Sequence, residues 1–242
     1  MRFLSLLLAC ILLIYCKKPS TNTLDLGLDY YPIAIDYWLE YDVDSISFSD
    51  FTDPITIDTA TYKIREIIES SYQDLNNEEN FRVESYKRIA DSMNWIIEDV
   101  FSLKQSSINT QKVENDLRFI KLVFPIKKSK TWNGNIYLDV IDEPSLDFYN
   151  PNKFEWEYTY SETNQSLDIG KFTFENCVTV IQIDEENLFE KKYSKEIYAK
   201  GIGLVYKELA ILETQAPPSE ATFLERTENG FILKYTISDY KK

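Results

Sequence analysis

Residues 112–140 read KVENDLRFIKLVFPIKKSKTWNGNIYLDV, and this stretch decides the fold that the sequence predicts. Residues 119–126 carry apolar side chains at both phases of a period-2 pattern, which is typical of a strand covered on both faces. Asn133-Gly134 indicates a hairpin turn, because both residue types accept a positive φ. We therefore expect a positive φ at Gly134 and a return strand over residues 136–141.

Period-2 alternation continues on both sides of this hairpin. Runs with aromatic or β-branched residues on one face predict half-buried strands. Such runs cover residues 37–43, 154–160, 172–183 and 231–237. Residues 81–89 are interpreted as a strand of mixed faces, and residues 95–103 as another apolar strand. Residues 59–72 fit both a strand and a helical stripe, and we interpret them as a strand.

The segments between these runs are less regular. We expect a polar turn over residues 161–170, a helical turn within the charged residues 184–195, and two strand pieces in residues 198–208 that join at residues 201–203. About ten or eleven strands at short spacing predict an all-β fold with little helix. The expected architecture is a mostly antiparallel, strongly curved sheet that closes as a barrel-like or two-layer β structure. Because few helical segments can cover the strands, we expect a concave apolar face.

Charge and composition argue against several classes of function. The 26 basic and 40 acidic residues give a net charge of -14, and a nucleic-acid partner is not expected because such binding needs a basic face. The chain has no histidine, which removes the commonest metal ligand and the usual general base. We predict no cofactor, no metal site and no catalytic residues.

The N-terminus carries the most specific address signal. Residues 3–15 are an apolar run that is too short to span a bilayer and fits a signal peptide. The run ends at Cys16, before a charged segment, and resembles the bacterial lipoprotein signal with Cys16 as the lipidated residue. Cleavage before Cys10 and an ordinary signal peptide with a chance cysteine are the alternatives. We expect a signal peptide over residues 1–15, a polar tether over 16–28, and one β-rich domain over 29–242.

The remaining candidate sites have plainer interpretations. Cys177 lies in an apolar run and is interpreted as a small core residue. Four acids after the first strand raise the possibility of calcium binding, but a solvated strand face is favoured: Asp42, Asp44, Asp50 and Asp53. Among 40 acidic residues some carboxylate pair is expected by chance, so such pairs carry no weight for glycoside hydrolysis. The four tryptophans are interpreted as core and edge aromatics rather than a sugar-stacking platform.

Several motifs together resemble a group of Bacteroidota exported lipoproteins of unknown function. They are Tyr30-Tyr31-Pro32 with Tyr37-Trp38, Glu114-Asn115, residues 121–125 (KLVFP), residues 132–135 (WNGN) and residues 198–208 (YAKGIGLVYKE). The resemblance implies an exported, lipid-anchored envelope protein with no assigned activity. Lys17 and Lys18 replace the acidic surface-export signal of that phylum, which favours the periplasmic side. Sites resembling its O-glycosylation pattern occur at Ser45, Thr59 and Ser92.

The leading hypothesis is therefore a non-enzymatic binding or interaction module of the cell envelope, held at the outer membrane by an N-terminal lipid. One alternative is a periplasmic carrier of a lipid or other apolar ligand. A glycan-active hydrolase is a further alternative. A cavity with convergent carboxylates would favour the hydrolase, and an apolar cavity would favour the carrier.

Overall fold

The computed structural model describes residues 24–138, 156–216 and 220–241. Within these ranges the chain is almost entirely strand, with two short 3₁₀ turns, η1 (Leu28–Tyr30) and η3 (Leu224–Arg226). The strands are β1 (Trp38–Ser49), β2 (Thr56–Gln73), β3 (Glu79–Arg88), β4 (Ile96–Gln105), β5 (Asn109–Glu114), β6 (Leu117–Val123), β7 (Thr131–Asn133), β8 (Glu157–Ile169), β9 (Phe172–Glu186), β10 (Glu190–Ala199), β11 (Gly203–Glu213) and β12 (Asn229–Tyr240). The prediction of an all-β fold with little helix is confirmed.

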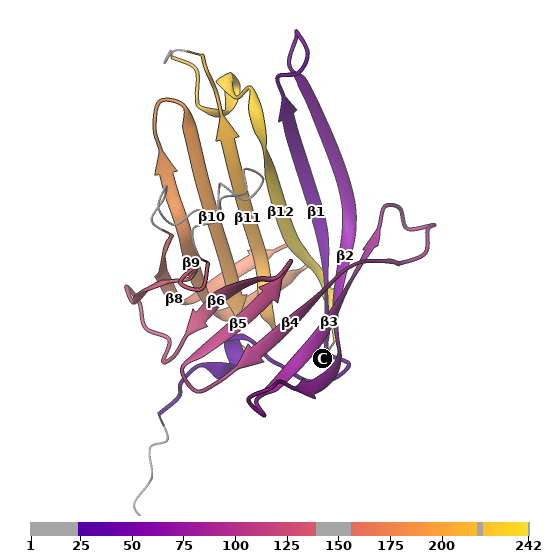
Figure 1. Cartoon of the computed structure of the whole chain (residues 1–242), viewed down its shortest axis with the longest axis vertical. Coiled ribbons are helices and arrows are strands. Elements are labelled where there is room, and N and C mark those ends of the chain that lie inside the picture. The colour runs from indigo at the N-terminus through magenta and orange to yellow at the C-terminus, as the bar shows by residue number, and fades with distance from the viewer. Residues whose placement is uncertain (1–23, 139–155, 217–219, 242) are drawn as a thin grey trace, which may run out of the picture.

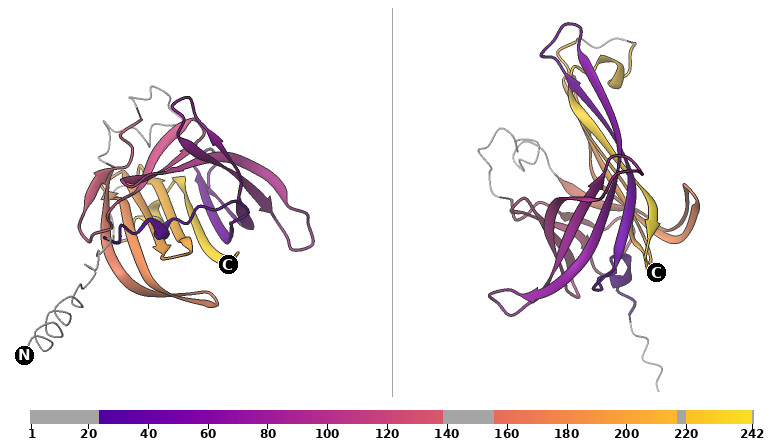
Figure 2. Two further views of the ribbon diagram at one scale, coloured as in Figure 1. Left: turned by 90° about the horizontal axis from the view of Figure 1, so that it is seen from below. Right: turned by 90° about the vertical axis from the view of Figure 1, so that its right-hand side faces the viewer.

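All twelve strands described belong to one antiparallel sheet, in the order β6-β5-β4-β3-β2-β1-β12-β11-β10-β9-β8-β7. Strands β1 to β6 pair in sequence order, and so do β7 to β12. β1 also pairs with β12, so the first and last strands meet in the middle of the sheet. In Figure 1, β10, β11, β12, β1 and β2 rise as a tall sheet, while β3 to β6 cross the lower half. The side view in Figure 2 shows how strongly that lower half curves.

The sheet curves until its two outer strands, β6 and β7, approach each other. The Ile120 N–H donates to the Gly134 carbonyl at 2.8 Å, and the Trp132 Nε1–H donates to the Ile120 carbonyl at 2.9 Å. The Tyr160 hydroxyl, on β8, lies 2.9 Å from both the nitrogen and the carbonyl oxygen of Val123. We call this junction the seam. It nearly closes the sheet into a barrel, which decides between the barrel-like and two-layer alternatives.

Buried side chains recur at alternate positions in several strands, as in β10, and form the core of the curved sheet. Tyr41, Tyr158, Tyr160 and Tyr198 are each at most 2 % exposed and are the largest of the fully buried side chains. Trp132 packs against Tyr160 with ring centroids 4.6 Å apart, next to the seam. Burial of aromatic rings of this size dominates the packing energy of a small core. The expected apolar concave face is present, but charged side chains interrupt it, as described below.

The predicted hairpin at Asn133-Gly134 is wrong. Residues 134–137 form a turn, so the described part of the expected return strand, residues 136–138, is not a strand; residues 139–141 lie outside the described residues. Gly134 does not have a positive φ. The tight hairpin lies earlier, between β5 and β6, where Asn115 and Asp116 have φ of 51° and 61° and Glu114 pairs with Leu117. Two consecutive positive φ values suit a two-residue hairpin loop, and Asn and Asp tolerate them well.

Three other segments test the strand predictions. Residues 59–72 are confirmed as part of a strand, β2. The polar turn expected over 161–170 is wrong, because β8 continues to Ile169 and turns only at Gly170. The helical turn expected within 184–195 is also wrong, because β9 and β10 cover most of that segment. Many polar residues of these long strands are exposed and others are buried at inward positions, so their polarity did not signal a turn.

The first described residues run beneath the lower half of the sheet (Figure 2). The Ile126 N–H donates to the Leu26 carbonyl at 3.2 Å, and the Gly201 N–H donates to the Asp29 carbonyl at 2.7 Å. Lys200 and Asp25 form an ion pair at 2.5 Å. The segment that the sequence assigned to the tether therefore already packs against the domain from Asp25 onward. Among the described residues no helix is long and apolar enough to cross a membrane.

Candidate functional site

A cavity of about 210 Å³ lies in the curved lower half of the sheet. Its charged lining residues are Glu66, Glu98, Asp99, Lys112, Glu114, Lys121, Glu196 and Lys207. Its aromatic lining residues are Tyr31, Tyr62, Phe119, Trp156, Tyr158, Tyr198 and Tyr235. The cavity is smaller than the roughly 300–1,000 Å³ typical of drug-sized ligands. Its lining suits a small polar molecule that can also contact aromatic rings.

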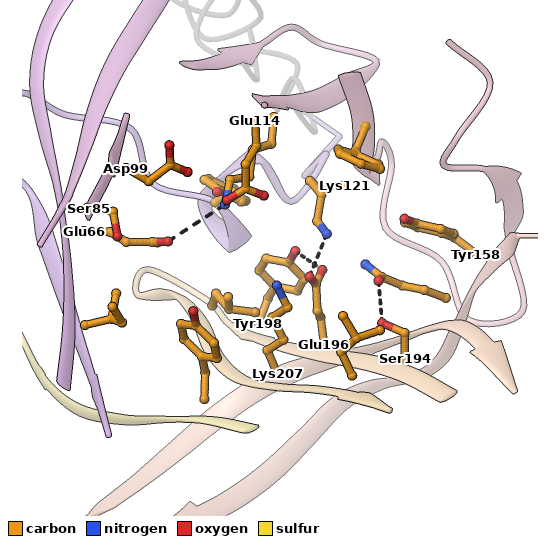
Figure 3. A pocket seen from close by; sticks show the side chains of 18 of the residues that line it. Glu66, Ser85, Asp99, Glu114, Lys121, Tyr158, Ser194, Glu196, Tyr198 and Lys207 are labelled. Atoms are coloured by element: carbon orange, nitrogen blue, oxygen red, sulfur yellow. Dashed lines mark hydrogen bonds and ion pairs between the residues drawn. The ribbon is translucent and has the colours of Figure 1, made fainter. Parts of the chain in front are cut away.

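One side of the cavity is built on a buried ion pair between β6 and β10. Lys121 Nζ lies 2.6 Å from Glu196 Oε1, and the Glu196 side chain is only 2 % exposed. The Tyr198 hydroxyl donates to Glu196 Oε2 at 2.6 Å (Figure 3). Burial raises the pKa of Glu196, but Lys121 and Lys207 outweigh it and hold the pKa below its usual range. Burial lowers the pKa of Lys121. Glu196 is therefore an ionised carboxylate inside the sheet.

A second ion pair joins two residues of β5. It leaves the Glu66 carboxylate, on β2, farther from the shared lysine. Lys112 Nζ lies 2.9 Å from Glu114 Oε1 but 3.9 Å from Glu66 Oε1. Burial favours neutral Glu114, yet Lys112 lowers the pKa of Glu114 to about 2. The pKa of Glu66 is instead raised, because burial outweighs the attraction of Lys112. Burial also opposes the charge of Lys112, and Glu114 and Glu66 raise its pKa nevertheless.

Within the described part of the chain, two further polar groups of the lining have no ion-pair or hydrogen-bond partner: the Lys207 ammonium and the Gln182 Nε2. Lys207, on β11, has no carboxylate within 4.0 Å of its ammonium in the described part of the chain, and its nearest aromatic ring is that of Tyr235 at 5.4 Å. Gln182, on β9, is 4 % exposed; its Oε1 accepts from the Ser194 hydroxyl at 2.7 Å. The Gln182 Nε2 is buried without a hydrogen-bond partner among the described residues. Such groups are costly to bury unless something satisfies them.

Strand alternation explains how these charges reach the interior. Glu66 has the same phase in β2 as the buried Ile64 and Ile68, and Lys207 has the same phase in β11 as Val205 and Leu209. Sequence reasoning missed the six residues of the two ion pairs and their neighbours as site residues: Glu66, Lys112, Glu114, Lys121, Glu196 and Lys207. The available signal was a charged residue at an inward position of an apolar strand. No spacing in the sequence indicated which of them would meet.

The residues singled out from the sequence do not converge on this cavity. Cys16 lies outside the described residues. Ser45 is on β1 and half-buried, Thr59 is on β2 and exposed, and Ser92 is exposed in the β3–β4 turn. O-glycosylation at these positions stays a prediction.

The four acids after the first strand do not form a site, and the four tryptophans do not lie together. Asp42 pairs with Lys63 at 2.6 Å on the outer side of β1 and β2. The described residues contain no group of three or more His, Cys, Asp or Glu placed to hold a metal ion. Trp38 and Trp95 flank the Arg65 guanidinium, with centroid distances of 4.9 and 4.5 Å. The other two tryptophans lie elsewhere. Trp132 donates a hydrogen bond across the seam to the Ile120 carbonyl, and Trp156 lines the cavity.

Cys177 is a core residue, as the sequence predicts. It is 1 % exposed and its thiol donates weakly to the Phe174 carbonyl at 3.7 Å. Burial raises the pKa of the Cys177 thiol to about 11. A thiol that stays protonated at neutral pH is a poor nucleophile, so the structure gives it a packing role.

The raised pKa of Glu66 predicts a pH-dependent cost to stability. In the unfolded chain Glu66 ionises near its ordinary pKa of 4.5, and in the folded protein it ionises only at higher pH. As the pH rises, the folded state therefore keeps its proton on Glu66 to a higher pH than the unfolded state does. The free energy of unfolding falls as the pH rises between the unfolded-state and folded-state pKa values of Glu66. Replacing Glu66 with Gln removes the ionisation. We expect E66Q to raise the melting temperature at pH 7 and to leave it nearly unchanged at pH 4.

Thermal unfolding followed by circular dichroism at both pH values tests this expectation. Glu162→Gln is the matched control, because Glu162 is an exposed partner of Lys128 on β8. A melting temperature that falls equally at pH 4 and pH 7 in E66Q would contradict the assignment of a destabilised carboxylate.

Comparisons with known proteins give two distant structural neighbours. No protein-family model matches the chain, and no curated protein matches it. A protein from Bacteroides fragilis described as exported, with a YmcC-like fold, aligns over 88% of this chain and 98% of its own, with 10% identity and a TM-score of 0.37. A protein from Parabacteroides distasonis described as a lipoprotein aligns over the same shares, with 8% identity and a TM-score of 0.31. Both TM-scores are below 0.5, so these neighbours carry no argument about the activity of this chain.

Proposed function

We propose that this protein is a lipid-anchored, non-enzymatic binding module of the cell envelope, and that it holds a small polar ligand in the cavity. The observation that supports this is the cavity lining. Among the described residues it holds an ammonium with no carboxylate within 4.0 Å, a carboxylate whose lysine is 3.9 Å away, and a buried amide nitrogen with no hydrogen-bond partner. Pre-formed polar groups on strands bind a ligand without the entropy cost of ordering a loop. Trp156, which is 4 % exposed in the lining, provides a reporter.

The test combines native mass spectrometry with intrinsic fluorescence. The full chain is purified without denaturation and examined for a bound small molecule. A panel of neutral sugars, amino acids and dipeptides is then titrated while tryptophan emission is recorded. We expect one polar class to bind saturably, and Ser85→Phe, which places a ring into the cavity lining, to abolish the signal. A folded protein with no bound mass and no response to any member of the panel would refute the proposal.

The lipid anchor is a separate part of this proposal and rests on the sequence alone. Lipid chains contribute about 0.8 kcal/mol per buried CH₂, so two or more chains hold a protein stably at a membrane. We expect Cys16→Ala to move most of the protein from the membrane fraction to the soluble fraction, and Cys10→Ala to leave it membrane-bound. Fractionation and intact mass check this. A wild-type protein without acyl mass would contradict it, and so would a C16A protein retained in membranes.

The alternative carrier of an apolar ligand has less support from the cavities. An apolar pocket lined by Tyr37, Leu39, Ile68 and Phe101 has only about 30 Å³, close to the space of one water. We expect a hydrophobic fluorescent probe to show no saturable binding that a lipid can displace. Displaceable binding would favour the carrier.

One observation favours a glycan-active hydrolase as a second candidate. Glu66 and Glu114 line the same cavity, and their environments move their pKa values in opposite directions. Such a pair can divide into a proton donor and an ionised base. However, the Lys112 ammonium contacts both carboxylates, and an ion triad of this kind also has a purely structural role. Hydrolysis of a chromogenic glycoside that E66Q abolishes would favour the enzyme over the binding module.

A further inference from the structure

Three charged groups of the cavity lie outside the close ion pairs of the described residues. They are the Glu66 carboxylate, the Lys207 ammonium and the Asp99 carboxylate, whose Oδ1 accepts from the Val100 N–H at 2.7 Å. The two ion pairs, Lys121–Glu196 and Lys112–Glu114, have Nζ–Oε distances of 2.6 and 2.9 Å. Glu66 is left with a shared lysine at 3.9 Å. Lys207 is left with no carboxylate within 4.0 Å among the described residues. Once the pairs are formed, the cavity therefore offers a ligand the Lys207 ammonium and the Glu66 carboxylate, with Asp99 as a second carboxylate of the lining.

These two groups face the same space from different strands. Figure 3 shows Glu66 entering from β2 and Lys207 rising from β11, with Glu114 and Lys121 opposite. The Lys207 charge is near enough to lower the pKa of Glu66, Glu114 and Glu196. Asp99, on the same side as Glu66 in Figure 3, adds negative potential there. The cavity is therefore polarised, with its acidic side at Glu66 and an ammonium at Lys207.

From this polarity we infer that the ligand is a small zwitterion, of amino-acid or dipeptide size, whose ammonium meets Glu66 and whose carboxylate meets Lys207. The inference rests on the proposed function and names its ligand class. A lone anion would pair with Lys207 but leave the half-buried Glu66 with only the Lys112 ammonium at 3.9 Å. A lone cation would pair with Glu66 but leave the half-buried Lys207 without a carboxylate within 4.0 Å among the described residues. A zwitterion completes both pairs and adds no net charge to the interior.

Two other features of the lining fit such a molecule. The Gln182 Nε2, which is buried and has no hydrogen-bond partner among the residues that the structure describes, is a donor available to an oxygen after a small side-chain shift. Aromatic faces also line the cavity, and Tyr31 and Tyr198 lie with ring centroids 5.8 Å apart. An ammonium near such rings gains a cation–π contribution beyond its ion pair. The volume of about 210 Å³ limits the ligand to a small metabolite rather than a long peptide.

The first test uses the wild-type full chain and ligands that differ by one charge. L-Alanine and alanyl-alanine are titrated by calorimetry, beside N-acetylalanine, which lacks the ammonium, and alaninamide, which lacks the carboxylate. We expect saturable binding of the free amino acid or the dipeptide and at least tenfold weaker binding of both blocked forms. Alanyl-alanine blocked at one end and a decapeptide are titrated as well. Binding of either would indicate that the cavity holds the end of a longer chain, and binding of neither would indicate a free metabolite. Equal binding of a blocked form overturns the inference.

The second test assigns each charge to its protein group. Lys207→Gln is expected to weaken the zwitterion at least tenfold and to leave alaninamide unchanged. Glu66→Gln is expected to weaken the zwitterion similarly and to leave N-acetylalanine unchanged. Lys128→Gln and Glu162→Gln, from an exposed ion pair at 2.6 Å, are the matched controls. Variants that bind the zwitterion as wild type does would overturn the inference.

Failure of the inference is distinguishable from failure of the proposed function. If a neutral sugar binds, Ser85→Phe abolishes that binding, and neither zwitterion binds, the cavity is a binding site for another class. If no polar solute binds to the folded protein, the binding site itself is refuted.

Discussion

Replacing Lys121 with Met should lower the free energy of unfolding by about 3–5 kcal/mol, because it removes one partner of a buried ion pair and leaves the other charged. Glu196 is 2 % exposed and would keep only the Tyr198 hydroxyl as a close partner. Met has a similar length, so little packing is lost. The remaining carboxylate would take up a proton to escape the low-dielectric interior. We therefore expect a larger loss at pH 7 than at pH 4.

Urea unfolding at the two pH values measures this loss. The double variant K121M/E196Q is expected to recover most of the stability, since neither charge then remains. Lys128→Met is the control, because its exposed pair with Glu162 is worth only about 0–1 kcal/mol. A loss in K121M no larger than that in K128M would show that the Lys121–Glu196 pair is not buried as described.

Replacing Gly134 with Val should destabilise the protein by about 2–3 kcal/mol through overpacking at the seam. A Cβ at this position would meet the ring of Tyr158, with Cε1 at 2.6 Å and two other ring atoms nearer still. Tyr158 is 2 % exposed, and its hydroxyl donates to Asn135 Oδ1 at 3.1 Å, so the ring cannot move aside. The valine would push β7 away from β6 and weaken the Ile120–Gly134 hydrogen bond.

A double-mutant cycle separates this clash from backbone strain. In a Tyr158→Ala background there is room for the new side chain, so we expect Gly134→Val to cost much less. Gly201→Ala is a useful comparison, because Gly201 has a φ of 77° with nothing within 4 Å of its Cβ position. Additive effects of G134V and Y158A would contradict the steric explanation.

Gly134 also shows where sequence reasoning stops. The dipeptide Asn133-Gly134 is a strong local turn signal, and the chain does turn there, but residues 136–138 are not the return strand of a hairpin. The glycine is needed for the close approach of Tyr158, which comes from 24 residues later in the chain. The tight hairpin formed instead at Asn115-Asp116, where the sequence also offers residues that tolerate positive φ.

The sequence by itself determined the properties that depend on neighbouring residues. Period-2 alternation predicted the strands and the all-β class, because the phase of a strand is a local property. The same pattern assigned residues 59–72 to a strand and Cys177 to the core, and the structure confirms both. It also placed Lys121 beside Phe119 on one strand face, but the local pattern did not indicate which residue would pair with Lys121.

Only the tertiary structure decided the closure of the sheet and the content of the cavity. Lys121 and Glu196 are 75 residues apart, and Glu66 and Lys207 come from strands at opposite ends of the chain. A charge at an inward strand position is costly alone and acceptable beside a partner, so its role depends on which strand lies opposite. That choice follows from how far the sheet curves before β6 meets β7, and curvature is set by all the side chains packed inside it, not by any local pattern.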